Sequence, residues 1–112
     1  MSKFGAIKTQ VNGIVFDSKA EARRYGQLLM LEKAGHITGL TLQVPFVLAQ
    51  GVKFEGDKRA KPPLRYVADF VYSDVKLGKI IVEDVKGVST PLFKVKRHLM
   101  LANHGIEVKV TR

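Results

Sequence analysis

The residues with the clearest chemical potential are charged side chains embedded in two strand-forming stretches. In the second stretch, Asp84 and Lys86 project from the same face and Glu83 from the other, because side chains alternate along a strand. The first stretch contributes another carboxylate, Asp69. Hydrolysis of a phosphodiester requires oxygen ligands for Mg²⁺ and a cation near the phosphate. The spacing therefore predicts a hydrolytic metal site formed by Asp69, Asp84 and Lys86.

Each of these residues also has an ordinary structural interpretation. Asp84 and Lys86 would form a surface ion pair, and Asp69 would be exposed at the end of a strand. Taken singly, the ordinary interpretations are favoured, but two acids and a lysine on consecutive strands together favour a site. A β-bulge would bring Glu83 into the site in place of Asp84, although only Asp84 shares strand parity with Lys86.

A third acid, Glu21, stands on an expected helix. Its neighbours at i+4 and i+7 are Tyr25 and Leu28, which places Glu21 on the apolar stripe. A carboxylate facing the sheet would complete the metal site. Ser18 and Glu21 also have the spacing of a capping box, in which Glu21 reaches back to the Ser18 N–H. The spacing alone leaves both interpretations of Glu21 open, metal ligand and helix cap.

The N-terminal half predicts a β-ribbon, a helix and a strand. Asn12-Gly13 suits a type I′ hairpin turn, which places the ribbon at residues 8–16. Asp17 and Ser18 offer N-caps for a helix over Ala20–Ala34. The strand expected over Leu40–Leu48 contains a proline, which is typical of a sheet edge or a bulge.

The C-terminal half predicts a basic, mobile connection at residues 51–64, followed by an antiparallel pair of strands over Arg65–Tyr72 and Lys79–Lys86. A second helix should begin at Thr90-Pro91 and end near Gly105. Its apolar stripe is expected at Leu92, Val95, Leu99 and Ala102. A half-exposed strand at residues 106–110 closes the chain.

The expected fold class is therefore α/β, with an α-β-β-β-α-β order after the leading ribbon. A mixed central sheet would be flanked by the two helices. At 112 residues and 46% hydrophobic content, the chain fits a single domain, residues 1–112, with its own core.

The charge balance points to a polyanionic partner. Nineteen Lys and Arg against ten Asp and Glu give a formal net charge of +9. Nucleic acid is the first candidate and a membrane surface the second. The chain has no cysteine, which excludes disulfides and zinc fingers and favours an intracellular setting. Without a signal peptide or a bilayer-length apolar run, a soluble cytoplasmic protein is expected.

Three local motifs carry a family resemblance: Phe16-Asp17-Ser18-Lys19-Ala20-Glu21-Ala22-Arg23-Arg24-Tyr25, Ala68-Asp69-Phe70 and Val82-Glu83-Asp84-Val85-Lys86-Gly87. With the element order, they resemble a phage-encoded branch of the PD-(D/E)xK nuclease superfamily, from Phe16 onward. Small members of this type are Holliday junction resolvases, which act in DNA recombination and repair. The chain departs from the superfamily pattern at Ala68, where proline is usual, and at the doubled acid Glu83-Asp84.

The resemblance implies a restriction-endonuclease-like fold and a role for each site residue. Asp69 and Asp84 would bind the metal together with Glu21, and Lys86 would be the catalytic lysine. The implied cofactor is Mg²⁺, for which Mn²⁺ would substitute. The implied enzyme is a homodimer that cuts four-way DNA junctions, in the host cytoplasm if it is phage-encoded.

Basic residues near the expected site are candidate phosphate contacts, although any one of them is equally an ordinary solvated side chain. They are Arg23, Arg24, Lys58, Arg59, Lys61, Lys94, Lys96 and Arg97. Two other functions stay open: a nicking or restriction-like endonuclease that acts on duplex DNA, and a basic DNA-binding protein without hydrolytic activity.

Overall fold

The computed structural model describes residues 8–112. Within them, six strands and two helices follow in the order β1 (Thr9–Val11), β2 (Ile14–Phe16), α1 (Lys19–Lys33), β3 (Ile37–Ala49), β4 (Leu64–Asp74), β5 (Lys79–Val85), α2 (Pro91–His104) and β6 (Lys109–Thr111). The chain is a mixed α/β protein, as the sequence predicts.

The leading ribbon forms where it is expected. Asn12 and Gly13 both have positive φ angles, 51° and 78°, which a type I′ turn requires. Val11 and Ile14 pair across this turn and pack against the core beneath α1. The ribbon is thereby attached to the helix that carries Glu21.

A four-stranded sheet in the order β3-β4-β5-β6 forms the centre of the molecule. The β3–β4 and β4–β5 pairs are antiparallel, and β5 and β6 are parallel because α2 connects them. The antiparallel pairing of β4 and β5 confirms the prediction. The final strand begins later than expected, since Ile106 and Val108 pack into the core from an irregular segment before β6.

The edge strand β3 is longer than predicted and irregular. Its register against β4 shifts between Thr38 and Thr41 and again between Val47 and Ala49. Pro45 lies in this strand, and β3 is an edge of the sheet, so the prediction of an edge or bulge is confirmed.

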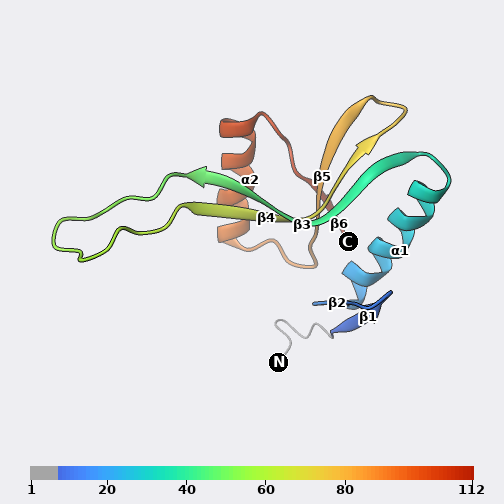
Figure 1. Cartoon of the computed structure of the whole chain (residues 1–112), viewed down its shortest axis with the longest axis horizontal. Coiled ribbons are helices and arrows are strands. Elements are labelled where there is room, and N and C mark those ends of the chain that lie inside the picture. Colours follow the sequence, from blue (N-terminus) through green and yellow to red (C-terminus); the bar gives the residue numbers. More distant parts are fainter. Residues whose placement is uncertain (1–7) are drawn as a thin grey trace.

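Two hydrophobic cores lie along the twisted β3–β4 pair. Phe70 and Tyr72 of β4 pack in the core with α1, whereas Tyr66 and Ala68 pack in the core with α2. These four residues have the same strand parity, so the pair must twist or bend between Ala68 and Phe70. Figure 1 shows α1 beside one half of this pair and α2 beside the other. Asp69 lies at the changeover.

Helix α2 has the predicted ends but not the predicted buried face. Thr90 caps its N-terminus, and Gly105 ends it with a φ of 67°. Most of the expected stripe is wrong, because Leu92 and Val95 are 63% and 54% exposed, although Leu99 packs against the core as predicted. Phe93 and Met100 are buried instead, seven residues apart on the neighbouring face. The ring of Phe93 packs beside Tyr66, which fixes the rotation of the helix.

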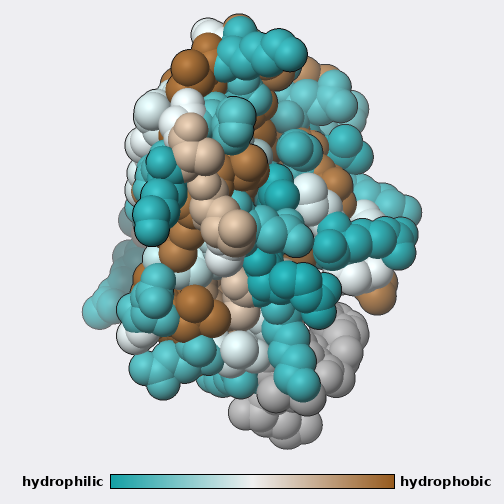
Figure 2. Space-filling view, turned by 90° about the vertical axis from the view of Figure 1, so that its right-hand side faces the viewer, coloured by the Kyte–Doolittle hydropathy of each residue, from teal (hydrophilic) through white to brown (hydrophobic). Residues whose placement is uncertain are grey.

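The side of the molecule that holds the β4–β5 turn also exposes hydrophobic residues, among them Val75, Leu77 and Ile80. Figure 2 views the molecule from its right-hand side and shows brown hydrophobic residues in patches among teal hydrophilic ones. Polar side chains therefore interrupt the apolar surface at this end.

Neither helix within residues 8–112 has the length and apolar character needed to cross a membrane.

Candidate active site

The site begins where β4 and β5 stop pairing. Toward the start of β4 and the end of β5, the last paired residues are Phe70 and Glu83. One residue further along β4, the Asp69 carboxylate accepts a hydrogen bond of 2.8 Å from the Val85 N–H through Oδ2. A side chain thus takes the place of a strand carbonyl. This bond holds Asp69 in the opening between the two strands.

Asp84 is the buried acid of the site, with 2% exposure. Its Oδ2 accepts a 2.7 Å hydrogen bond from the Tyr66 hydroxyl. Its Oδ1 is buried and has no hydrogen-bond partner among the described residues, although Lys86 Nζ lies 3.3 Å away as an ion pair. A buried carboxylate oxygen between Lys86 and Asp69 can donate an electron pair to a metal ion.

Lys86 lies beside Asp84, as the alternation of side chains predicts. Its ammonium is 4.9 Å from the centroid of the Phe93 ring and remains about one-third exposed. Its backbone N–H donates to the Thr111 carbonyl at 2.8 Å, which joins this end of β5 to β6. The lysine is therefore anchored at its backbone, and its charged end reaches solvent beside a buried carboxylate.

The pKa values of both aspartates are raised. Burial, the largest cause, raises the pKa of Asp69 to about 6, with Asp84 and the Val85 N–H opposing and Glu21 adding to the rise. Burial and the adjacent Asp69 raise the pKa of Asp84 to about 7, against the effects of Tyr66 and Lys86. Near neutral pH the pair therefore still carries part of one proton, mainly on Asp84, and a bound cation would displace it.

Glu21 both belongs to a helix cap and faces the site. The Ser18 hydroxyl accepts from the Glu21 N–H at 3.1 Å, and the Glu21 carboxylate accepts from the Asp17 N–H at 3.3 Å, one residue before the position a capping box requires. The other carboxylate oxygen lies 3.4 Å from Nε2 of Gln43. The side chain therefore binds the Asp17 N–H instead of the Ser18 N–H of the predicted capping box, and its role as a metal ligand stays a prediction.

Gln43 is a site residue that the sequence analysis missed. Its Nε2 lies 3.4 Å from both Glu21 Oε1 and Asp69 Oδ1, so its amide bridges the two acids. Gln43 also has a φ of 53°, which is uncommon for a residue other than glycine. No local sequence pattern indicates a positive φ at Gln43 within a strand.

Asp69 and Asp84 provide the oxygen ligands that a Mg²⁺ ion would use, with Glu21 behind Asp69. Within residues 8–112, no three acidic, histidine or cysteine side chains come together as a ready-made metal site. Mg²⁺ retains several water ligands and is commonly held by one or two carboxylates. The carboxylates of Asp69 and Asp84 therefore fit this ion.

Glu83 occupies a separate, structural position. It is fully buried and receives hydrogen bonds from Arg24, Tyr72 and Thr111. Two nitrogens of Arg24 bind this carboxylate, and a third donates to Gln27 at 3.1 Å. The guanidinium of Arg24 therefore neutralises a buried acid, and its predicted contact with phosphate stays a prediction.

The other predicted phosphate contacts lie on three separate elements. Arg23 is exposed on α1, while Lys58, Arg59 and Lys61 lie between β3 and β4. On α2, Lys94 and Arg97 are exposed and Lys96 is half-buried.

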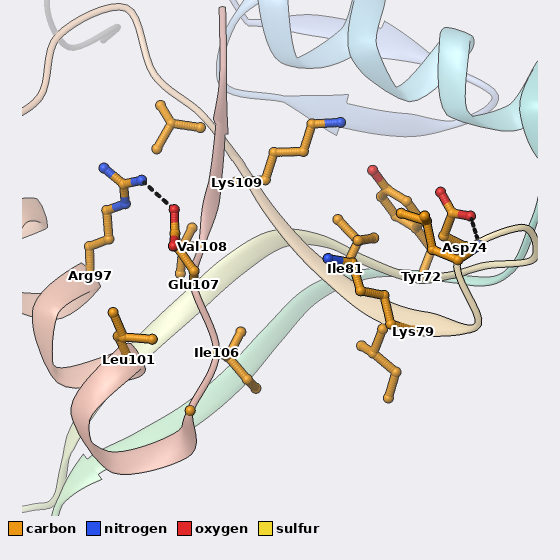
Figure 3. A pocket seen from close by; sticks show the side chains of 14 residues that line it. Tyr72, Asp74, Lys79, Ile81, Arg97, Leu101, Ile106, Glu107, Val108 and Lys109 are labelled. Carbon is orange, nitrogen blue, oxygen red and sulfur yellow. Dashed lines mark hydrogen bonds and ion pairs between the residues drawn. The ribbon is translucent and has the colours of Figure 1, made fainter.

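A cavity of about 950 Å³ lies between β5, β6 and the C-terminal part of α2. Figure 3 shows Arg97 and its partner Glu107 at one side of it, with a nitrogen–oxygen distance of 3.7 Å. Glu21, Asp69, Asp84 and Lys86 do not line this cavity. The candidate active site is thus the open acid cluster between β4 and β5 and not the largest hollow described.

The chain belongs to the family described as "Protein of unknown function (DUF1064)", which matches residues 1–112. No curated protein and no solved structure shows significant similarity to it.

Proposed function

We propose that this member of the DUF1064 family is a Mg²⁺-dependent DNA endonuclease. The observation that carries the proposal is the grouping of Asp69, Asp84 and Lys86 where β4 and β5 separate, with a buried Asp84 oxygen that forms an ion pair with Lys86. Glu21 joins the group through Gln43. Acids and a lysine around one opening match the requirements of phosphodiester hydrolysis.

The fold supports the same assignment. After the ribbon, the elements run α1-β3-β4-β5-α2-β6, and the sheet combines antiparallel strands with a parallel β6. This is the order expected for a restriction-endonuclease-like core of the PD-(D/E)xK type. In such a core the acids and the lysine stand on the second and third strands, which are β4 and β5 here.

Each residue has a distinct task in the proposed reaction. Asp69 and Asp84 would hold Mg²⁺, which would supply Lewis-acid chemistry for the phosphate and the attacking water. Lys86 places its positive charge beside the phosphate as negative charge accumulates on the oxygens. Tyr66 holds Asp84 in place through its hydroxyl, and Gln43 orients Glu21 and Asp69.

Branched DNA is the proposed substrate, and a homodimer the proposed assembly. A junction is recognised mainly through the shape of its phosphate backbone. The surplus of cations in this chain suits contacts with phosphates better than contacts with base edges. A two-fold dimer would present two active sites to strands related by the junction's own symmetry.

The test is cleavage of labelled four-way junctions and matched linear duplexes by the purified protein with Mg²⁺, at one fixed salt concentration. Asp84→Asn and Lys86→Ala should each lower cleavage at least 100-fold while junction binding is retained. Glu107→Gln and Lys76→Ala, which change an exposed acid and an exposed lysine outside the cluster, are the matched controls.

Cleavage by both site variants at the rate of the controls would remove the nuclease assignment. Equal cutting of junction and duplex would leave a nuclease but remove the preference for branched DNA.

A further inference from the structure

The β3–β4 connection, residues 50–63, projects away from the rest of the molecule and is called the arm here. Figure 1 shows it extending beyond α2 as a long hairpin. The arm continues the two strands that carry Gln43 and Asp69. Any contact made by the arm is therefore transmitted through the same strand pair that positions the acids.

The arm has a defined backbone structure. Val52 and Lys61 form a two-way backbone pair, with N···O distances of 3.2 and 2.5 Å. At the apex, the Asp57 N–H donates to the Phe54 carbonyl at 3.0 Å, and Gly56 has a φ of 87°. This is a tight turn that needs glycine at its third position.

Gly51 allows the two chains of the arm to approach each other. A Cβ atom at this position would lie 2.5 Å from the Lys61 carbonyl oxygen, a backbone atom. The close approach at the base of the arm therefore depends on the absence of a side chain. The basic connection predicted at residues 51–64 has the backbone of a hairpin in the structure.

The arm exposes an aromatic side chain at its apex. Phe54 is 62% exposed and Val52 is 52% exposed, and neither belongs to the two hydrophobic cores. Phe54 is the first residue of the apical turn, so its ring stands at the far end of the molecule. Exposed apolar side chains of this size at a projecting tip indicate a contact surface.

Positive charge surrounds this aromatic residue. Between residues 50 and 65, five cations stand against two acids: Lys53, Lys58, Arg59, Lys61 and Arg65, with Glu55 and Asp57. One of the cations, Lys61, lies 3.8 Å from Asp57. A two-stranded ribbon with cations along both chains fits a groove lined by two phosphate backbones.

We infer that the arm binds branched DNA and places Phe54 against an unstacked base at the branch point, an inference that rests on the proposed function. Aromatic side chains stack on exposed bases, and apolar wedges enter disturbed base steps, while flanking cations hold the backbone. The twelve residue-to-residue steps from Asp57 to Asp69 span at most roughly 40 Å, which is close to one turn of duplex DNA. The apex would therefore contact DNA within about one turn of the phosphate at the acid cluster.

The test measures binding without cleavage. Full-length Asp84→Asn protein is titrated with four-way junctions that carry 2-aminopurine at the branch point, and with linear duplexes, at one salt concentration. Addition of Phe54→Ala should weaken junction binding roughly ten-fold, abolish the protein-dependent rise in 2-aminopurine fluorescence and leave duplex binding within about two-fold. Phe54→Trp should preserve both signals, because a larger aromatic ring still stacks.

The matched control is Leu77→Ala, which removes a side chain of similar exposure, 61%, in the β4–β5 turn. Replacing both Lys58 and Arg59 by alanine should lower the salt dependence of junction binding by about two counterions.

Junction binding and fluorescence unchanged by Phe54→Ala would overturn the inference, even if the wild-type protein cleaves DNA. Tighter binding of the same full-length protein to anionic vesicles than to junctions would also overturn the inference. Conversely, a protein that binds through Phe54 and never cleaves would refute the proposed nuclease and leave the role of the arm intact.

Discussion

Arg24 on α1 binds both carboxylate oxygens of Glu83 on β5, using Nε and Nη2. The Glu83 side chain is completely buried and that of Arg24 is 18% exposed. Burial alone would raise the pKa of Glu83, but hydrogen bonds from Arg24, Tyr72 and Thr111 hold it below its ordinary value. The pair therefore joins α1, β4, β5 and β6 immediately behind Asp84.

The first prediction is that Arg24→Met destabilises the fold by about 3–5 kcal/mol, because it leaves a buried carboxylate without its cation. The double change Arg24→Met with Glu83→Gln should cost clearly less, since no buried charge remains. Urea unfolding of the two variants and the wild type measures the difference. If the single and double variants lose the same stability, the ion pair does not have the role assigned to it.

The sequence predicted the local elements well because their determinants are local. Asn12-Gly13 specified the ribbon turn, and Ser18 and Thr90 specified the helix starts. Strand parity correctly placed Lys86 next to Asp84, and the structure places Glu83 on the other side of the strand.

The sequence could not predict features that depend on distant packing. Which face of α2 is buried depends on the contact between Phe93 and Tyr66, which lie far apart in the chain. The role of Arg24 depends on Glu83, 59 residues away. The contribution of Gln43 depends on a positive φ in an edge strand, which no local pattern indicates.

The second prediction concerns pH and follows from Asp84, whose pKa is raised to about 7. An aspartate in an unfolded chain titrates near pH 4, so the folded state binds this proton more tightly. The resulting stabilisation is complete below about pH 4 and is lost as the pH rises through about 7. In metal-free buffer, thermal stability should therefore fall across this range.

The check is a series of melting temperatures for wild-type and Asp84→Asn protein from about pH 4 to about pH 8. The variant cannot ionise, so it should melt several degrees above the wild type at the alkaline end. Equal pH dependence of the melting temperature in both proteins would show that the pKa of Asp84 is not raised. Asp74→Asn, which changes the acid at the end of β4, is the control.

The third prediction is that Mg²⁺ or Mn²⁺ raises the melting temperature at about pH 8, because binding relieves the repulsion between Asp69 and Asp84. Ca²⁺ should stabilise the protein with little cleavage, since its looser coordination positions water less well. Neither Asp84→Asn nor Asp69→Asn should respond to the metals as the wild type does. A wild-type shift fully retained in both variants would place the metal elsewhere.

The fourth prediction concerns Tyr66, whose hydroxyl donates to Asp84 at 2.7 Å. Tyr66→Phe removes a donor that lowers the pKa of Asp84, so this pKa should rise. Metal binding and cleavage should then shift toward higher pH, with the maximal rate partly recovered there. Tyr72→Phe is the matched control because its hydroxyl binds Glu83. The same alkaline shift in the control, or none in Tyr66→Phe, would contradict a positioning role for Tyr66.

The last prediction separates the two roles of Glu21. The Ser18 hydroxyl caps α1 through the Glu21 backbone N–H, so this cap does not depend on the Glu21 side chain. Glu21→Gln also keeps an oxygen that can accept from the Asp17 N–H. The variant should therefore melt within about 2 °C of the wild type, because the hydrogen bonds of the helix start are preserved.

Cleavage by Glu21→Gln should nevertheless fall at least ten-fold, because the negative charge next to Asp69 is lost while the shape is retained. Gln43→Ala should lower cleavage as well, since it removes the amide that contacts Glu21 and Asp69 at 3.4 Å. Ser18→Ala provides the opposite pattern: it should cost about 1 kcal/mol of stability and leave the cleavage rate of the folded protein unchanged. Full activity of a stable Glu21→Gln enzyme would restrict Glu21 to capping the helix and leave Asp69, Asp84 and Lys86 as the proposed site.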